Sequence, residues 1–286
     1  MKNLIILFYK ILRLINNFTE KIFKKEFLLF IKNLIEKDSY KKIIILDQKI
    51  IFFTPNQLIN WRVNTFFSKE PETLKWIDKF KIKNKTVFWD IGSNIGLYSI
   101  YAALNHGNLK VIAFEPSTSN LRVLSRNISI NNLENQISIC QLPLSQNPLN
   151  FNKINESDFQ EGFSENTFGE DINYEGKKMK VHHSYELLGT SINQLLKDGV
   201  LKCPNYMKID VDGIEHLILS GATSALEDIS LKSILVEINE DFKKQHDTVF
   251  KMMNDYHFKL KSKSRAEEFY KDNMSGVYNF IFEKNE

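Results

Sequence analysis

The chain has 286 residues, of which 43% are hydrophobic, which is enough to bury the core of one large domain or of a domain with an extension. Its net charge of +3 at pH 7 is too small to indicate nucleic-acid binding by itself. Its two cysteines, Cys140 and Cys203, are too few for a disulfide framework or a zinc site.

Residues 1–37 are expected to form one or two amphipathic helices. Apolar residues recur at helical spacing through residues 4–22, and Lys10 and Arg13 interrupt the apolar run before it is long enough for a secretory leader or a membrane span. Residues 1–45 hold ten Lys or Arg and four Asp or Glu, a local charge of +6. We expect the apolar stripe to pack on the rest of the chain, and peripheral membrane contact is the alternative.

The next segments complete an N-terminal extension. Residues 41–55 are predicted to form a short hairpin with Asp47 and Gln48 at its turn, and residues 57–80 to be helical with a break before Pro71. The predicted organisation is a helical extension with a hairpin over 1–80, followed by one domain over 81–286.

From residue 86 onwards, predicted strands and helices alternate. Such alternation predicts an α/β fold with a mostly parallel sheet and helices on both faces, closed by an antiparallel pair. The expected helices lie at residues 94–105, 117–131, 214–226 and 241–256. The expected strands are TVFWDIG (86–92), KVIAFEP (110–116), QISICQL (136–142), YMKIDVDG (206–213), SILVEIN (233–239), FKLKSKS (258–264) and VYNFIFEK (277–284).

A polar, irregular stretch over residues 146–185 separates the third and fourth of these strands. Long segments of this kind inside a domain are usually functional or mobile, and this one approaches the carboxyl edge of the sheet, where ligands bind in such folds. We interpret it as a lip over the substrate, with a disordered surface insertion as the alternative.

A turn of the pattern Gly92-x-Asn94-x-Gly96 follows the first of these strands, with Asp90 just before it. A dinucleotide site requires G-x-G-x-x-G, so the turn favours a nucleoside ligand without phosphates, such as S-adenosylmethionine. Glu115 ends the next strand, where a carboxylate can accept hydrogen bonds from two ribose hydroxyls. Asp90 is expected to contact the cationic part of the ligand. The backbone amides of the turn are expected to bind the carboxylate of the ligand.

With these residues in view, the sequence resembles the FkbM family of methyltransferases. The similarity rests on FWDIGSNIGLYS, VIAFEPSTSNLRVLSRNISINN, YMKIDVDGIEHLILSGA and ILVEIN. The resemblance implies a Rossmann-like class I fold with a seven-stranded sheet, S-adenosylmethionine as cofactor, and O-methylation of hydroxyls on sugars or polyketide-type products. Asp212 stands where the family usually has Glu, and TSINQLL (190–196) replaces the usual TLDDL, so the acceptor does not carry over.

Two strand-end carboxylates are the candidate catalytic residues. Asp210 is expected near the transferred methyl group, as a base, and Glu237 near the acceptor hydroxyl. Asp212 and Glu215 have capping-box spacing, which favours a structural role, with a place in the pocket lining as the alternative for either. With Asn239, Asp210 and Glu237 could bind Mg²⁺, although we favour a reaction without metal. His182 and His183 in the lip are an alternative source of the base.

The leading hypothesis is therefore a cytoplasmic O-methyltransferase acting on a small-molecule or glycan acceptor, with no nucleic-acid partner. The alternatives are an NAD-type oxidoreductase, which the missing third glycine disfavours, and a non-catalytic membrane-associated protein with a vestigial cofactor pocket, suggested by the basic N-terminal helix. Nothing in the sequence indicates an oligomeric state.

Overall fold

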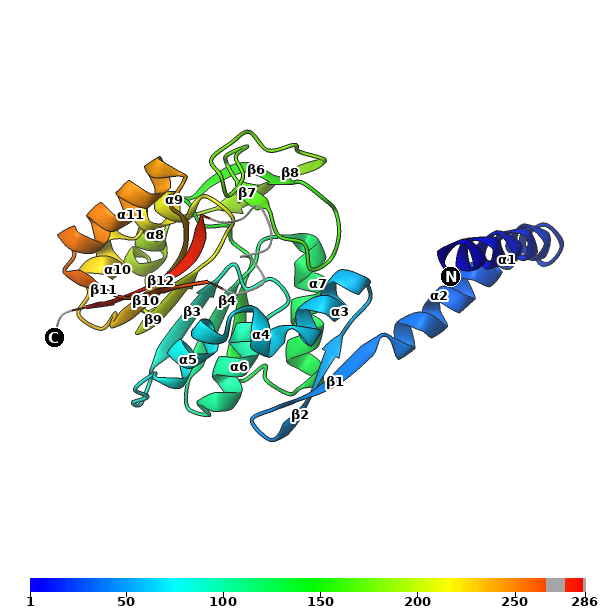
Figure 1. Ribbon diagram of the computed structural model, residues 1–286, viewed down its shortest axis with the longest axis horizontal. Coiled ribbons are helices and arrows are strands. Elements are labelled where there is room, and N and C mark those ends of the chain that lie inside the picture. The colour runs from blue at the N-terminus through cyan, green and yellow to red at the C-terminus, as the bar shows by residue number, and fades with distance from the viewer. Residues whose placement is uncertain (266–275, 285–286) are drawn as a thin grey trace.

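Seven strands form one sheet at the centre of the protein, in the order β11-β12-β10-β9-β3-β4-β5 (Figure 1). The structure is a computed structural model that describes residues 1–265 and 276–284. Strand β12 is antiparallel to both of its neighbours, whereas the pairs from β10 to β5 are parallel. This confirms the predicted Rossmann-like sheet. The strands are β3 (Val87–Ile91), β4 (Lys110–Phe114), β5 (Ile137–Cys140), β9 (Tyr206–Ile209), β10 (Ser233–Asn239), β11 (Phe258–Ser264) and β12 (Val277–Lys284).

Helices cover both faces of the sheet and create two apolar cores. One core packs α6 and α7 against the sheet, and the other packs α8 to α11 against the opposite face (Figure 1). Burial on both faces explains why the strands have nearly continuous apolar sequences. The helices are α6 (Leu97–Asn105), α7 (Thr118–Ile130), α8 (Ile192–Lys197), α9 (Glu215–Ser220), α10 (Thr223–Glu227) and α11 (Lys243–Asp255).

The segment before the glycine turn contributes to the first core. Phe52 and Phe66 are fully buried in it, and Trp76 donates a hydrogen bond from Nε1 to Ser233 Oγ on β10 at 2.9 Å. The predicted extension is therefore joined to the sheet through shared apolar packing from the hairpin onwards. Its elements are the hairpin strands β1 (Tyr40–Ile45) and β2 (Gln48–Phe53), and the helices α3 (Gln57–Asn64), α4 (Phe66–Lys69) and α5 (Pro71–Asp78).

The turn of the hairpin lies one residue earlier than predicted. Leu46 and Asp47 have φ values of 48° and 60°, and Gln48 already belongs to β2. Two consecutive residues with positive φ are the geometry of a type I′ turn, which matches the twist of the two strands.

The first two helices, α1 (Lys2–Phe23) and α2 (Phe27–Asp38), extend away from the sheet and pack on each other (Figure 1). Neither contains a buried residue. The expectation that their apolar stripe packs on the rest of the chain was therefore wrong. In the described part of the chain, no helix combines the length and the apolar character needed to cross a membrane.

The stretch over residues 146–185 is more regular than predicted. Much of it forms a three-stranded antiparallel sheet of order β7-β6-β8, made of β6 (Asn150–Glu156), β7 (Asn166–Phe168) and β8 (His183–Gly189). The connection between β6 and β7 lies at the carboxyl edge of the large sheet, where Phe163 and Ser164 line two cavities. The prediction missed these strands because their sequences are polar and alternate only weakly.

Candidate active site

The glycine turn connects β3 to α6 and depends on backbone conformations that most residues avoid. Gly92 and Gly96 have φ values of 84° and 87°, and Asn94 has 49°. A Cβ atom on Gly92 would lie 1.8 Å from the carbonyl oxygen of Asp210, so only glycine fits between β3 and the end of β9. The turn is fixed to the next strand by the amides of Gly92 and Ser93, which both donate to the carbonyl of Phe114 at 3.0 Å.

Glu115 lies directly after β4 and faces this turn. Its two carboxylate oxygens accept hydrogen bonds from the backbone amides of Asn94 at 2.7 Å and Ser117 at 2.9 Å. Burial of the carboxylate nevertheless outweighs these bonds and raises the pKa of Glu115 to about 8. Glu115 thus lies directly after the strand, where the sequence places it.

A narrow cavity of about 60 Å³ opens beside Glu115. Its walls come from the turn, the ends of β4, β5 and β9, and the lip. It is lined by Ile91, Gly92, Asn94, Phe114, Glu115, Pro116, Asn120, Leu142, Pro143, Leu144, Ile154, Phe163, Ser164, Asn166, Phe168, Asp210, Val211, Asp212, Ile214 and Ile218.

Asn94 lies where this cavity meets a larger one. Its Nδ2 donates to the carbonyl of Phe163 at 3.0 Å, which ties the turn to the lip. Its Oδ1 is buried and has no hydrogen-bond partner among the described residues. An orphaned acceptor in this position is suited to a donor from a bound ligand, because leaving it unsatisfied is costly.

Asp90 is placed differently from the other predicted cofactor residues. It is fully buried beneath the turn, where Oδ2 accepts a hydrogen bond from Ser99 Oγ at 2.6 Å. Burial raises the pKa of Asp90 although Lys208 opposes the shift. Asp90 does not line either cavity, so any contact with a ligand would pass through the turn or through water.

The larger cavity, of about 340 Å³, lies on the other side of Asp210. Three carboxylates from the ends of β9 and β10 meet there: one ligand atom each from Asp210, Asp212 and Glu237 lies within 4.8 Å of the others. The remaining lining residues are Leu58, Trp61, Arg62, Phe66, Lys69, Glu70, Gly92, Ser93, Asn94, Ile95, Leu97, Tyr98, Phe163, Ser164, Glu165, Tyr174 and Lys208.

Burial and mutual repulsion shift the pKa values of two of these carboxylates. Burial, followed by the charge of Asp210, raises the pKa of Asp212 to about 6. The same two causes raise the pKa of Glu237 well above its ordinary value. The cluster therefore favours a cation or a proton.

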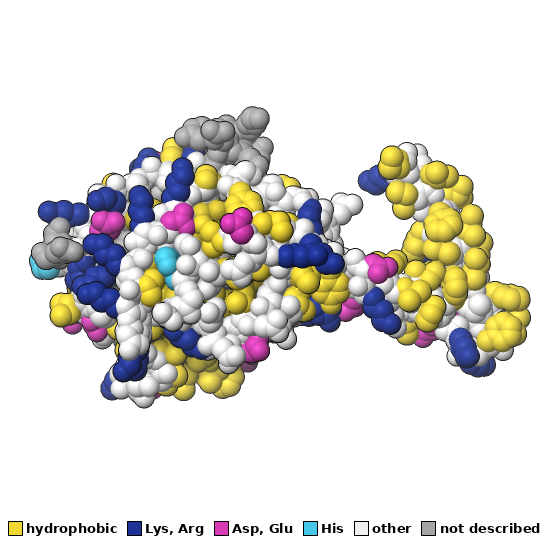
Figure 2. Space-filling view, turned by 90° about the horizontal axis from the view of Figure 1, so that it is seen from below, with side chains coloured by type: hydrophobic (Ala, Val, Ile, Leu, Met, Phe, Trp, Pro, Cys, Tyr) yellow, Lys and Arg dark blue, Asp and Glu magenta, His cyan; other side chains and the backbone are white. Residues whose placement is uncertain are grey.

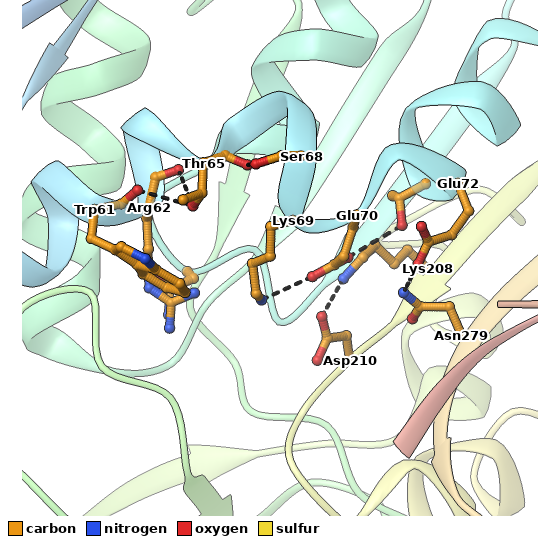
Figure 3. A network of polar contacts seen from close by, with 12 residues as sticks. Trp61, Arg62, Thr65, Ser68, Lys69, Glu70, Glu72, Lys208, Asp210 and Asn279 are labelled. Atoms are coloured by element: carbon orange, nitrogen blue, oxygen red, sulfur yellow. Dashed lines mark hydrogen bonds and ion pairs between the residues drawn. The ribbon is translucent and has the colours of Figure 1, made fainter. Parts of the chain in front are cut away.

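A buried lysine lies beneath the cluster. Lys208, on β9, is 1% exposed and pairs with Asp210 Oδ2 at 2.6 Å (Figure 3). Burial lowers the pKa of Lys208, but the carboxylates of Asp210, Glu70 and Asp90 outweigh it and keep the lysine charged. Glu70 in turn accepts an ion pair from Lys69 at 2.9 Å. This network holds Asp210 in position and supplies one positive charge to the three carboxylates.

Sequence reasoning missed this part of the site. Trp61, Arg62, Lys69 and Glu70 come from α3, α4 and the residue after α4, for which no motif was available (Figure 3). Lys208 could have been found, because a lysine inside the apolar run of a central parallel strand is unusual unless it is paired.

The predicted capping box between Asp212 and Glu215 is absent. Helix α9 begins at Glu215, whose carboxylate accepts from the amides of Val211 at 3.0 Å and Gly213 at 3.1 Å. Asp212 has a φ of 61° and instead accepts from the amide of Glu165 at 2.8 Å. Glu215 thus bonds the backbone at the start of α9 and lines neither cavity, whereas Asp212 joins the lip to the site and lines both cavities.

The candidate metal ligand Asn239 and the candidate bases His182 and His183 do not join the carboxylate cluster. The amide group of Asn239 donates to the carbonyl of Tyr174 at 3.1 Å and accepts from the amide of Asp241 at 3.0 Å, and it does not line either cavity. His182 and His183 are exposed and also lie outside both cavity linings. Asp212 therefore takes the place that was expected for Asn239.

Comparisons with known proteins place this site in a family. A family model described as the methyltransferase FkbM domain matches residues 90–260. Methyltransferase sdnD of Sordaria araneosa is 26% identical over 175 residues, which cover 54% of this chain and 68% of that protein. Hexuronic acid methyltransferase AglP of Haloferax volcanii is 27% identical over 161 residues, covering 54% of this chain and 56% of AglP.

Among solved structures, the FkbM methyltransferase of Methylobacillus flagellatus aligns with a TM-score of 0.46 at 13% identity, covering 72% of this chain and 45% of that one. The M. capricolum protein TrmK, solved with S-adenosylhomocysteine, aligns with a TM-score of 0.43 at 15% identity, covering 74% and 68% of the two chains. Because the family model spans more than half of the sequence and includes the turn, Glu115 and the carboxylate cluster, this chain belongs to the FkbM methyltransferase family.

Proposed function

We propose that the protein is an S-adenosylmethionine-dependent O-methyltransferase that acts on a hydroxyl of a sugar, a glycan or a related metabolite. The observation that carries this proposal is the meeting of two cavities at Gly92, Asn94 and Asp210. The smaller cavity has a buried carboxylate that can accept hydrogen bonds from a ribose. The larger cavity has carboxylates that can bind the hydroxyl of the methyl acceptor.

The smaller cavity is suited to the nucleoside part of the cofactor. Glu115 accepts the ribose hydroxyls, and apolar residues such as Leu142 and Phe168 face the base. The orphaned Oδ1 of Asn94 is available to the ammonium group of the amino-acid part. The turn amides expected to bind its carboxylate already donate within the protein: those of Gly92 and Ser93 to Phe114, and that of Asn94 to Glu115. When bound, S-adenosylmethionine supplies an electrophilic methyl group on a sulfonium. Asp90 supports this arrangement from below through Ser99 and α6.

The larger cavity is suited to the acceptor. Asp210, held by Lys208, is placed to orient the acceptor hydroxyl and to take its proton. Glu237 is placed to hydrogen-bond the same acceptor, and burial together with the charge of Asp210 raises its pKa, which favours the protonated form that can donate. We favour this metal-free arrangement because the Lys208 ammonium already occupies one side of Asp210, although the three carboxylates could hold Mg²⁺.

The rim of the larger cavity supports a sugar as acceptor. Trp61 lines the cavity and is 40% exposed, so its ring can pack against the apolar face of a sugar (Figure 3). The relative AglP is a hexuronic acid methyltransferase, which supports the same substrate class.

Replacing Glu115 with alanine tests the cofactor assignment. We expect the free energy of S-adenosylmethionine binding to weaken by about 1.5–3 kcal/mol, the value of hydrogen bonds to a charged group. Titration calorimetry measures this loss, with Glu134→Ala, an exposed acid beyond α7, as the control. Unchanged affinity in folded Glu115→Ala would remove the ribose assignment, and tighter binding of NAD than of S-adenosylmethionine by the wild type would favour an oxidoreductase.

The affinity for the cofactor is also expected to depend on pH. Since burial raises the pKa of Glu115 to about 8, the free protein holds a neutral carboxylic acid below that pH. If the ribose binds the carboxylate, binding must release a proton, and Kd should rise about tenfold for each pH unit below about 8 and level off above it. Glu115→Gln cannot ionise and should abolish this slope. A wild-type slope no steeper than that of Glu115→Gln would contradict the assignment.

A further inference from the structure

The helical pair α1–α2 presents a large apolar surface that nothing in the described part of the chain covers. Figure 2 shows this surface at the end of the molecule remote from the sheet. We propose that the pair is a membrane anchor that lies in the interface of an anionic bilayer. The large apolar side chains exposed on the pair are Leu4, Ile5, Ile6, Leu7, Phe8, Tyr9, Ile11, Leu14, Ile15, Phe18, Ile22, Phe23, Leu29, Phe30, Leu34 and Ile35.

The charges on α1 lie on the side opposite to its apolar face. At 100° per residue, Leu4, Leu7 and Phe18 cluster on one side of the helix. The basic residues cluster on the other, and Glu20 is the single acid of α1. Lysine and arginine stems on such a face reach the head groups while the apolar face enters the acyl region.

The net charge of the helical pair favours a membrane surface with anionic lipids. Residues 1–38 hold eight Lys or Arg and four Asp or Glu, a charge of +4. Anionic head groups attract each such residue near the membrane surface. A second copy of the chain would instead bring two sets of basic residues together, so charge complementarity favours the bilayer over self-association.

The geometry indicates an anchor in the plane of the membrane. Helix α1 has 22 residues and is roughly 33 Å long, yet it is too polar to span a bilayer. Aromatic residues at the corner between the helices, Phe23, Phe27 and Phe30, line a groove together with Lys24 and Lys25. Aromatic and basic side chains together are typical of the head-group level.

The anchor is joined to the methyltransferase domain by defined contacts. Asn16 Oδ1 accepts from the amide of Leu28 at 2.8 Å, which fixes α1 against the start of α2. Glu36, near the end of α2, pairs with Arg122 and Arg126 on α7, each at 2.9 Å. The pair projects away from the sheet and is joined to α7 through the end of α2.

Sedimentation of the full chain with vesicles tests this inference. With vesicles of phosphatidylcholine and phosphatidylglycerol, the wild type should sediment, and with phosphatidylcholine alone it should bind much less. Leu7→Glu should reduce the vesicle-bound fraction by tenfold or more, because a large apolar side chain is lost from the interface. Lys10→Glu should weaken binding several-fold on the anionic vesicles only.

Matched controls separate the anchor from general surface effects. Ile229→Glu changes a side chain that is 81% exposed outside the pair and should bind as the wild type does. Because Leu7 is not buried, Leu7→Glu should keep the wild-type melting temperature. A wild type that stays in solution with anionic vesicles, a Leu7→Glu variant that sediments normally, or an apolar face that instead forms dimers in analytical ultracentrifugation would each overturn the inference.

Discussion

Asp210→Asn is expected to lower the rate of methyl transfer by roughly 10²–10⁴, the usual contribution of a positioned general base. Asparagine keeps the size of the side chain and its reach towards Lys208, but it removes the charge that accepts the proton of the hydroxyl. The effect should fall on turnover, because Glu115 and the glycine turn are the groups assigned to the cofactor. A single-turnover assay with a panel of sugars and glycosides would measure it.

Three results distinguish the roles open to Asp210. Cofactor affinity lost as severely as in Glu115→Ala would place Asp210 in the cofactor pocket, and full activity would make it structural. Activity of the wild type that EDTA abolishes and Mg²⁺ restores would assign Asp210, Asp212 and Glu237 to a metal. Asp255→Asn, at the exposed end of α11, controls for the substitution itself.

Gly92→Ala should destabilise the protein more than any other substitution in the turn. The new Cβ would collide with the carbonyl of Asp210, and the φ of 84° would be strained for alanine. The two costs together are on the order of 2–5 kcal/mol in the free energy of unfolding. Urea unfolding would measure the loss, and cofactor binding should fall with it because β3 and β9 must separate.

Two other glycines can separate the conformational strain of Gly92→Ala from its steric collision. Gly199 has a φ of 66° but open space around its Cβ position, so Gly199→Ala reports the conformational strain alone. Gly107 has neither feature, and Gly107→Ala should be close to neutral. If Gly92→Ala costs no more than Gly199→Ala, the contact between the turn and the end of β9 is looser than the structure indicates.

The sheet and the cofactor side of the site were predictable because local patterns encode them. Apolar runs mark β3, β4, β9 and β10, and the topology then brings their carboxyl ends to one edge. Glu115 and Asp210 could be placed for this reason alone.

The acceptor side was not predictable in the same way. Trp61 and Lys69 reach the cavity through tertiary packing of short helices whose sequences carry no recognisable motif. The role of Asp212 depends on a positive φ that permits a bond to Glu165 in the lip, a contact between residues far apart in sequence. The stripe on α1 fits packing and membrane contact equally well, and periodicity alone does not choose between them.

The wall of the larger cavity formed by residues 58–70 lies outside residues 90–260, which carry the family resemblance. The proposed acceptor cavity is therefore built partly from this stretch and partly from the family region, which contributes Asp210, Asp212 and Glu237. We expect substitutions of Trp61 and Arg62 to change which acceptor is preferred while the turn, Glu115 and the sheet stay intact. Exchanging residues 58–70 between relatives is therefore a direct way to test whether this wall sets the choice of acceptor.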